Sequence, residues 1–347
     1  MRALVWDGPL ALGVAEIAEA AAGPGEVVIG PVAGICGSEI EAYLGRQPNR
    51  VPPLVMGHEL AGLVLACGPR ADPQLAGALV AVNPIVSCGR CSFCASGARN
   101  LCREKELIGL ARPGGFAERV AVPAANLVRL PAGTDPRTGA FVEPMANGVH
   151  AARLALGGRT AVRAVVIGAG AIGLCAVQAL RRLGAGRIDV LEPDERRRAT
   201  AAAAGADAVH ADPAALLSAT GTPGRPRAQA GAGADAVIDA AGTSAARALA
   251  VDAAAAGATV VLAGMGEDRT ELAFRPVVRD EIVLRGSYAY TDADFGQAAA
   301  WLAAGQVSPG PMEPAAPLED GPALFARLAT GPAGPVRLFL SAGHGRD

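Results

Sequence analysis

The sequence feature that constrains the fold most is a glycine-rich stretch, GAGAIG, at residues 168–173. It joins a run of small apolar residues to an apolar segment with helical spacing, so we expect a strand over 164–170 and a helix over 171–185. In the pattern G-x-G-x-x-G, the first glycine permits a tight turn, the second lets the backbone approach a pyrophosphate, and the third lets helix and strand pack closely. The helix N-terminus adds amides and a partial positive charge. The candidate cofactor residues of this stretch are Gly168, Gly170, Ile172 and Gly173.

The segments that follow continue the alternation of strands and helices. Further strands are predicted at 187–193, 234–242 and 258–266, and helices at 194–206 and 244–257. Such alternation is typical of parallel β-α-β units in an open sheet. The stretch 220–233, rich in Gly, Pro and Ala, is expected to be a surface loop.

An acidic residue stands where a dinucleotide site needs one. Glu192 follows Gly173 by nineteen residues, at the end of the second predicted strand. Its carboxylate can accept a hydrogen bond from the ribose 2′-hydroxyl and repels a 2′-phosphate, which favours NAD over NADP. Three arginines at 196–198 favour NADP instead, because an arginine such as Arg197 can hold a 2′-phosphate. A solvated charge at a helix start is the alternative for Glu192.

The N-terminal part of the chain differs in character. Short apolar runs at 26–34, 60–68 and 78–86 are separated by Gly and Pro, which is typical of short strands. The chain is long enough for two domains. We therefore expect an α/β protein with a β-rich domain at 1–145, a Rossmann domain with a doubly wound parallel sheet at 146–284, and a less regular segment at 285–347.

Four cysteines fall within fifteen residues, at 88, 91, 94 and 102. A reducing cytosol disfavours disulfides, and the spacing C-x2-C-x2-C-x7-C favours a metal. Zinc is favoured over an iron–sulfur cluster, because the C-P element of bacterial ferredoxins is missing. Four thiolates complete a tetrahedron and leave no open position, so Cys88, Cys91, Cys94 and Cys102 predict a structural zinc in a lobe at 86–104.

A second set of ligand types is scattered more widely. GICGSE contains Cys36, GHELAG contains His58 and Glu59, and VEPM contains Glu143. Cys, His and carboxylate side chains all bind zinc, and a catalytic zinc keeps one position open for water or substrate. Taken singly, Cys36 and His58 are better explained as a buried thiol and a core imidazole; taken together they indicate a metal site.

GICGSE, GHELAG, the four-cysteine lobe, VEPMANGVHA and VIGAGAIG occur in this order along the chain. With them the sequence resembles the zinc-dependent medium-chain dehydrogenase/reductase family, in particular its sorbitol, galactitol-phosphate and threonine dehydrogenase branch. The resemblance implies a GroES-like catalytic domain to which the C-terminal segment returns. It also implies two zinc ions per chain, NAD(P) as cofactor, and a homodimer or homotetramer.

By the same resemblance, Cys36 and His58 bind the catalytic zinc. Glu59 binds it in some states or supports the ligands from behind, and Glu143 is a ligand or an exchanging carboxylate. Ser38 matches the hydroxyl that takes the alcohol proton while the substrate gives a hydride to the nicotinamide. This chain departs from the family at Glu39, where an aspartate usually holds the ligand histidine, so the orientation of His58 is less secure. It has Glu41 where many relatives carry a histidine that ends the proton relay. Glu41 can relay a proton, contact a polar substrate or face solvent.

Net charge is −2, which shows no footprint for nucleic acid or an anionic membrane. The start of the chain lacks the features of a secretory signal, and no apolar stretch is long enough to span a membrane. We therefore expect a cytoplasmic enzyme that oxidises a secondary alcohol of a polyol, sugar, cyclitol or similar polar compound, or reduces the ketone. The alternatives are a biosynthetic dehydrogenase of an aminocyclitol or specialised metabolite, and a non-catalytic protein on the same fold.

Overall fold

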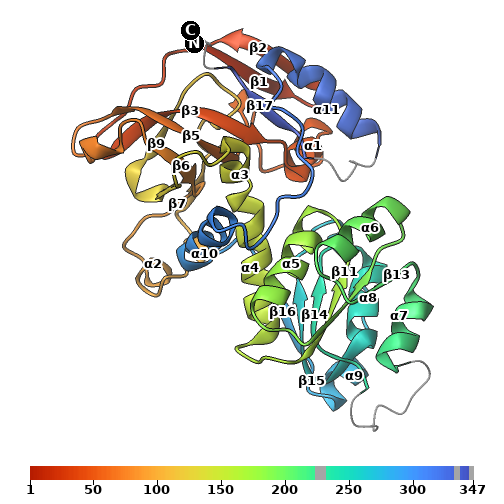
Figure 1. The fold of residues 1–347 in the computed structure, drawn as a ribbon. Coiled ribbons are helices and arrows are strands. Elements are labelled where there is room, and N and C mark those ends of the chain that lie inside the picture. The colour runs from red at the N-terminus through yellow and green to blue at the C-terminus, as the bar shows by residue number, and fades with distance from the viewer. Residues whose placement is uncertain (223–231, 332–336, 344–347) are drawn as a thin grey trace. The chain divides into compact units, whose positions relative to one another are not determined.

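The computed structural model describes residues 1–222, 232–331 and 337–343 (Figure 1). The chain divides into two compact units, one made of Met1–Glu143 with Thr291–Asp347 and the other of Pro144–Tyr290. The second unit extends beyond the expected boundary at residue 284, because its last strand is still paired at Gly286. Most of the loop expected at 220–233 lies outside the described residues.

The first unit is rich in short strands, as the sequence predicted. Its strands are β1 (Arg2–Gly8), β2 (Ala11–Glu16), β3 (Glu26–Gly34), β4 (Leu54–Val55), β5 (Glu59–Cys67), β6 (Leu79–Val82), β7 (Ile85–Val86), β8 (Glu106–Leu107), β9 (Val120–Pro123), β10 (Leu127–Arg129) and β17 (Phe339–Ser341). Its helices are α1 (Gly37–Tyr43), α2 (Ser92–Ala95), α3 (Pro136–Ala140), α10 (Asp292–Ala303) and α11 (Gly321–Thr330), with α4 (Val142–Leu156) starting at its boundary. Short 3₁₀ turns are η1 (Pro73–Leu75), η2 (Arg99–Leu101), η3 (Ala124–Asn126) and η4 (Leu318–Asp320).

The main sheet of this unit has the strand order β10-β6-β5-β3-β17, with β9 also paired to β3. The β3–β5 ladder is antiparallel and ends where Gly34 pairs with Glu59. Midway along it the two backbones pass so closely that a Cβ on Gly62 would lie 2.1 Å from the Gly30 carbonyl oxygen. Only glycine fits this position, so the last residue of GHELAG has a packing role.

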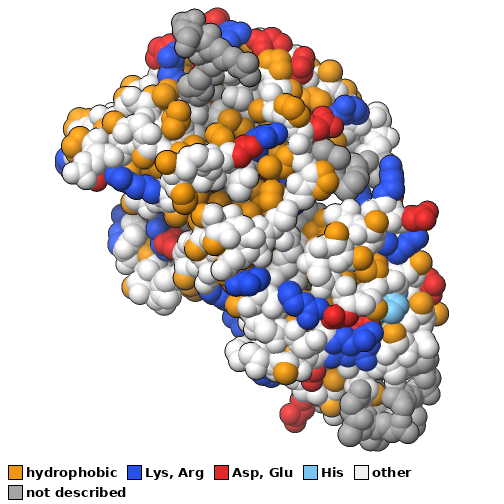
Figure 2. All heavy atoms as spheres, in the orientation of Figure 1, with side chains coloured by type: hydrophobic (Ala, Val, Ile, Leu, Met, Phe, Trp, Pro, Cys, Tyr) orange, Lys and Arg blue, Asp and Glu red, His pale blue; other side chains and the backbone are white. Residues whose placement is uncertain are grey.

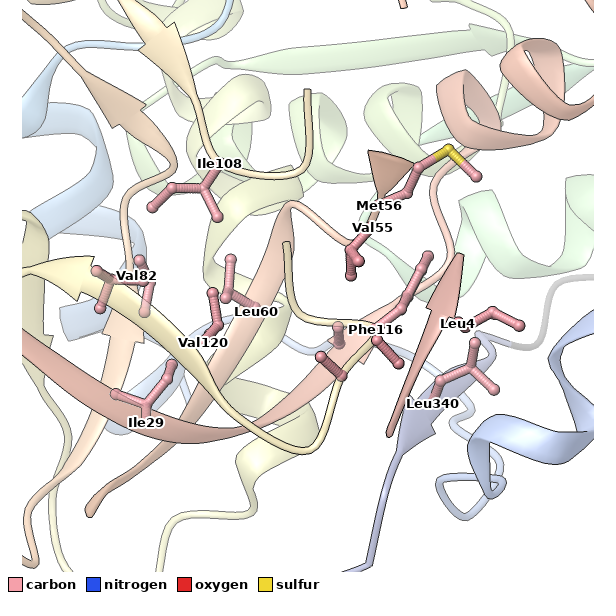
Figure 3. Packing of buried hydrophobic residues seen from close by; sticks show 14 of the residues in the cluster. Leu4, Ile29, Val55, Met56, Leu60, Val82, Ile108, Phe116, Val120 and Leu340 are labelled. Atoms are coloured by element: carbon pink, nitrogen blue, oxygen red, sulfur yellow. The ribbon is translucent and has the colours of Figure 1, made fainter. Parts of the chain in front are cut away.

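The core of the first unit is apolar and is closed by the C-terminal segment. Figure 3 shows Ile29, Leu60, Val82, Phe116 and Leu340 packed within it. Leu318, Phe325 and Leu340 belong to the same cluster, although they lie some two hundred residues beyond the rest. In this structure the C-terminal segment packs into the core of the N-terminal unit.

The second unit is a parallel sheet with helices, as predicted. It consists of β11 (Arg163–Ile167), α5 (Ala171–Arg182), β12 (Arg187–Leu191), α6 (Glu195–Ala203), β13 (Ala208–His210), α7 (Pro213–Thr220), β14 (Ala234–Asp239), α8 (Ser244–Ala253), β15 (Ala254–Leu262), α9 (Phe274–Arg279) and β16 (Val283–Gly286). The strand order is β13-β12-β11-β14-β15-β16 with all pairs parallel (Figure 1). The order reverses between β11 and β14, which is the point where such sheets bind dinucleotides.

One helix boundary was predicted wrongly. The sequence predicts that the helix after β14 continues through the alanines to residue 257, because alanine is the strongest helix former. In the structure α8 ends at Ala253, and Ala254 already pairs with Ala234 in the sheet. Parallel pairing with β14 overrides the local propensity here.

The exposed surface carries charges of both signs, interspersed on the face drawn in Figure 2. Several arginines form ion pairs at the surface, such as Arg181 with Asp207 and Arg90 with Glu104. Exposed pairs of this kind each stabilise a protein by about 0–1 kcal/mol. Within the described ranges, the structure has no helix that combines the length and apolarity needed to cross a membrane.

A buried ion cluster holds the second unit together. Asp189, on β12, is 0% exposed and accepts hydrogen bonds from Arg163 and Arg187 at 2.9–3.1 Å. His210 Nε2 lies 3.1 Å from Asp189 Oδ1, the oxygen that also accepts from Arg187 Nη2. Burial alone would raise the pKa of Asp189, but the hydrogen bonds from Arg187, His210 and Arg163 outweigh it and lower the pKa.

We predict that Asp189→Asn lowers the free energy of unfolding by about 2 kcal/mol or more at pH 7, because it leaves two arginines without their carboxylate. A carboxyl with a lowered folded pKa stabilises the protein above its unfolded pKa of about 3.9, and the effect is lost as the pH falls through the folded pKa. Urea unfolding should therefore show a difference between wild type and variant that is constant from pH 7 to 5 and narrows below about pH 4. Asp268→Asn, at an exposed position, is the control. Equal stability of wild type and Asp189→Asn at pH 7 would contradict the prediction.

Candidate functional site: a metal centre, a cysteine lobe and a nucleotide cradle

The ladder between β3 and β5 brings the first group of predicted site residues together. Gly34, the last residue of β3, pairs with Glu59, the first residue of β5. Cys36 follows β3 by two residues and caps helix α1, while His58 directly precedes β5. Because both lie just beyond the same end of one ladder, residues twenty-two apart in the sequence meet in space.

Cys36, His58 and Glu59 form a group whose ligand atoms all lie within 4.8 Å of one another. Glu59 is 7% exposed, and the carboxylate of Glu143, at the start of α4, is close enough to affect its ionisation. Burial and the Glu143 charge raise the pKa of Glu59 to about 7. Burial, together with the Glu59 charge, likewise raises the pKa of the Cys36 thiol.

These shifts describe a buried cluster in which the charges of neighbouring carboxylates raise the pKa of Glu59 and of the Cys36 thiol. A divalent cation among thiolate, imidazole and carboxylate ligands would offset the repulsion, and this donor set suits zinc. The residues therefore fit a zinc ion. Glu143 is not part of the group within 4.8 Å, so the structure brings together three of the four predicted ligands and places the fourth nearby.

Glu39 orients the histidine. Its Oε1 atom lies 2.8 Å from His58 Nδ1 and also accepts hydrogen bonds from the backbone amides of Gly57 and His58. Its Oε2 atom accepts from the amide of Cys36 at 3.0 Å. Burial alone would raise the pKa of Glu39, but the neighbouring His58 and Arg50 charges and the hydrogen bonds lower it. An ionised Glu39 keeps the proton of His58 on Nδ1 and leaves Nε2 to act as a ligand.

In the sequence, Glu39 in place of the usual aspartate made the orientation of His58 uncertain; in the structure Glu39 contacts His58 directly. The longer side chain reaches His58 from the first turn of α1, at a distance of 2.8 Å. The extra methylene is accommodated because the carboxylate is fully buried and bonded on both oxygens.

Ser38 and Glu41 are placed differently by the same helix. The Ser38 hydroxyl lies 3.4 Å from Cys36 Sγ and accepts a hydrogen bond from Arg50 at 3.1 Å. Glu41 is 44% exposed at its side chain and pairs with Arg46 at 3.3 Å. Among the described residues no hydrogen bond joins Glu41 to Ser38, so Ser38 is beside the ligands and Glu41 faces solvent.

The four predicted lobe cysteines also come together. Their sulfur atoms all lie within 4.8 Å of one another, with Cys91 at the start of α2 and Cys102 directly after η2. A hydrogen bond with Ser87 lowers the pKa of Cys94 to about 6, which favours the thiolate. Four cysteines in one group fit a zinc ion without an open position.

The lobe is tied to a distant part of the chain. Arg99, within the lobe, donates to Asp292 at 2.7 Å and to Ser87 at 2.6 Å. Asp292 opens helix α10 and also accepts from Asn83 at 2.9 Å. The cysteine lobe is thereby linked to the segment that returns from the C-terminal third of the chain.

The nucleotide cradle lies in the second unit, at the switch point between β11 and β14. Gly168 has φ +93, and a Cβ there would lie 3.2 Å from Ala241, two residues after the end of β14. The first glycine therefore makes the tight turn. A Cβ on Gly173 would lie 1.9 Å from the Gly168 carbonyl oxygen, so the third glycine packs the helix against the turn. A Cβ on Gly170 would meet nothing within 4 Å. The space beside Gly170 is where a pyrophosphate would approach the helix N-terminus, and Ile172 lies half-buried in the first turn of α5.

Glu192 lies at the same edge of the sheet, but its carboxylate already has partners. Oε2 accepts from the amide of Ala169, inside the glycine-rich loop, at 2.8 Å, and Oε1 accepts from the amide of Asp194 at 3.0 Å. Glu192 therefore positions the loop in this structure; its binding to ribose stays a prediction. Arg197 lies half-buried on α6, three residues after the N-cap Asp194, whose side chain accepts hydrogen bonds from the amides of Arg196 and Arg197.

Sequence reasoning missed Arg50. It lies in the loop between α1 and β4, is 9% exposed, and contacts Ser38. No spacing rule marks a single arginine in a loop, and only the three-dimensional structure brings it to the site.

Comparison with known protein families supports the same assignment. Residues 23–132 match the alcohol dehydrogenase GroES-like domain and residues 171–304 match the zinc-binding dehydrogenase family. The chain is 34% identical over 281 residues to L-galactonate-5-dehydrogenase of Escherichia coli, covering 79% of each chain. It is 34% identical over 265 residues to sorbitol dehydrogenase of Arabidopsis thaliana, covering 74% of this chain and 71% of the relative.

A solved structure extends the similarity to the whole fold. A putative zinc-binding dehydrogenase from Sinorhizobium meliloti, bound to NADP, superposes with a TM-score of 0.87 at 29% identity, covering 98% of each chain. The two family matches and the similar structure thus agree with a fold made of a GroES-like part and a Rossmann part. The chain belongs to the zinc-dependent medium-chain dehydrogenase/reductase family, and it is an NAD(P)-dependent oxidoreductase.

Proposed function

We propose that this enzyme transfers a hydride between a secondary alcohol of a polyhydroxylated substrate and NAD, with Cys36, His58 and Glu59 holding a catalytic zinc. The observation that carries the proposal is the cluster of these three ligands with the Ser38 hydroxyl 3.4 Å from the Cys36 sulfur. Glu143 is proposed as an exchanging ligand, because its charge reaches Glu59. Cys88, Cys91, Cys94 and Cys102 are proposed to hold a structural zinc.

Zinc, when bound, supplies a Lewis acid that lowers the pKa of an alcohol hydroxyl, and the nicotinamide supplies the hydride acceptor. Ser38 is proposed to accept the proton that leaves the substrate hydroxyl and to release its own proton to solvent, which its half-buried side chain can reach. Arg50 donates a hydrogen bond to Ser38 Oγ and so orients the hydroxyl. Because a guanidinium stays protonated at ordinary pH and has no acceptor atom, Arg50 does not receive the proton. Glu39 holds His58 in one tautomer and one orientation.

The Glu41 side chain is proposed to lie outside the direct relay. Its exposure and its ion pair with Arg46 favour a solvated role over contact with the reacting hydroxyl. The enzyme is proposed to be a cytoplasmic homo-oligomer, as the family resemblance implies. The preference for NAD rests on Glu192, whose negative charge lies beside the loop that would carry the nucleotide.

The function is tested by turnover on a panel of alditols, sugar acids, aminocyclitols and terpenoid alcohols, read by NADH absorbance. We expect the purified enzyme to contain two zinc ions per chain and to oxidise polyhydroxylated substrates with NAD⁺ in preference to NADP⁺. One zinc or none per chain would contradict the proposed centres. A tenfold or greater preference for NADP⁺, worth about 1.4 kcal/mol, would contradict the cofactor assignment.

Removing one thiolate from each metal group should have different effects. Cys36→Ser should lower kcat/KM by more than about 100-fold with little change in the melting temperature, because that site supports chemistry. Cys91→Ser should lower the melting temperature by several degrees, because a structural zinc contributes to folding. Activity assays, thermal melts and zinc analysis distinguish the two. An active Cys36→Ser enzyme, or a Cys91→Ser enzyme as stable as wild type, would overturn the respective assignment.

Two glycines of the cradle offer a matched pair. Gly170→Val places its side chain in open space at an ordinary backbone conformation, so the fold should be unaffected while the Kd for NADH rises by about 30-fold or more, or ~2 kcal/mol. Gly173→Val forces its side chain into the Gly168 carbonyl and should lower stability by about 3 kcal/mol. Cofactor titration and thermal melts measure the two effects. Unchanged NADH binding by Gly170→Val would place the pyrophosphate elsewhere.

A further inference from the structure

Arg50 is a buried cation next to the proposed metal ligands; its charge favours the ionised form of Glu39, but no ion pair joins the two side chains. It is 9% exposed and lies in the loop between α1 and β4. Its Nη2 donates to Ser38 Oγ at 3.1 Å and its Nη1 to the Gly109 carbonyl oxygen at 3.2 Å. Both acceptors are neutral.

The charge of Arg50 has no ion-pair partner among the described residues: no carboxylate there lies within 4.0 Å of the guanidinium. Glu39 is nearby but is already bonded on both oxygens, to His58 and to the backbone amides of Cys36 and Gly57. Buried arginines are almost always paired. The two hydrogen bonds leave about three of the five N–H groups of the guanidinium for another acceptor.

Both partners of Arg50 adjoin the reaction centre. Ser38 lies 3.4 Å from the Cys36 sulfur. Gly109 packs so tightly against the backbone that a Cβ there would lie 3.1 Å from the amide nitrogen of His58. A substrate whose hydroxyl lies beside Ser38 is therefore within reach of the guanidinium.

We propose that Arg50 binds the carboxylate of a sugar-acid substrate, so that the enzyme acts on polyhydroxy acids in preference to neutral polyols. The inference rests on the proposed function and narrows its substrate class. A planar guanidinium fork matches a carboxylate in geometry and charge, and a neutral hydroxymethyl group at the same place would leave the buried charge unpaired. The relatives do not decide the matter, because an L-galactonate dehydrogenase and a sorbitol dehydrogenase are both 34% identical to this chain.

The test compares a hexonate with the hexitol of the same configuration, which carries CH₂OH in place of the carboxylate. In the zinc-loaded enzyme with NAD⁺, Arg50→Gln should lower kcat/KM for the hexonate by about 100-fold, mainly through KM. The loss of kcat/KM on the hexitol should be at least about tenfold smaller, because both substrates lose the contact between Arg50 and Ser38 but only the hexonate also loses an ion pair. Arg50→Lys, which keeps the charge but not the fork, should recover part of the loss.

A binding measurement separates recognition from chemistry. Isothermal titration of the hexonate into zinc-loaded enzyme without nicotinamide gives a Kd in the absence of turnover. Arg50→Gln should weaken this Kd by about 30-fold or more. Arg129→Gln, at an exposed arginine on β10, is the matched control and should leave both kcat/KM and Kd unchanged. Thermal melts of each variant identify any loss of folding. If Arg50→Gln does not fold, the kcat/KM and Kd values of Arg50→Lys are compared with those of wild type instead.

Three results would overturn the inference. Equal losses on hexonate and hexitol, with a shifted pH profile, would make Arg50 a positioning residue for Ser38. Better turnover of a hexitol phosphate than of the hexonate by wild type would identify a phosphate as the anion. Hexonate binding that is independent of Arg50 would exclude the contact. If wild type oxidises no alcohol in the panel, the proposed function fails, and the titration alone then decides whether Arg50 binds the carboxylate.

Discussion

The buried carboxylate of Glu39 is the interaction on which the proposed metal centre depends. It bonds the imidazole of His58, the amides of Gly57 and His58, and the amide of Cys36. Removing a carboxylate from water costs several kcal/mol, and these bonds offset that cost only when all of them form together. Two segments that precede a strand and a helix are thereby held in one arrangement before any metal binds. A preorganised centre of this kind is what allows three different ligand types to meet within 4.8 Å.

The two groups of metal ligands are built in different ways, and this explains why one was easier to recognise. The cysteine lobe is local: its four sulfurs come from fifteen residues and need only two short helical turns to meet. The other group depends on the ladder between β3 and β5, and its members are separated by loops. Spacing rules describe the first kind of site well. The scattered ligands of the second kind of site were recognised only because the whole sequence resembles a known family.

The same distinction governs how much could be predicted. The parallel sheet and its glycine-rich loop follow from local patterns, and β3 begins and ends where the sequence placed it. Ala254 was assigned to a helix because propensity is local and strand pairing is not. Glu192 was expected to face a ribose, yet its carboxylate is bonded to the loop amide of Ala169, which no spacing rule shows. Arg50 escaped notice because its importance arises from contacts with Ser38 and Gly109, twelve and fifty-nine residues away.

The path of the chain through the first unit has a consequence for biosynthesis. The strand β17 pairs with the centre of that unit, and Leu318, Phe325 and Leu340 complete its core. A ribosome makes these residues after the second unit, which is a continuous segment that ends at Tyr290. Because domains fold as units during synthesis, the nucleotide-binding unit can reach its final structure while the N-terminal half of the other waits with an open core. The cysteine lobe shares this dependence through Arg99 and Asp292. The order of emergence therefore lets the nucleotide-binding unit fold before the metal-binding unit is complete, although the candidate metal ligands precede the nucleotide-binding unit in the sequence.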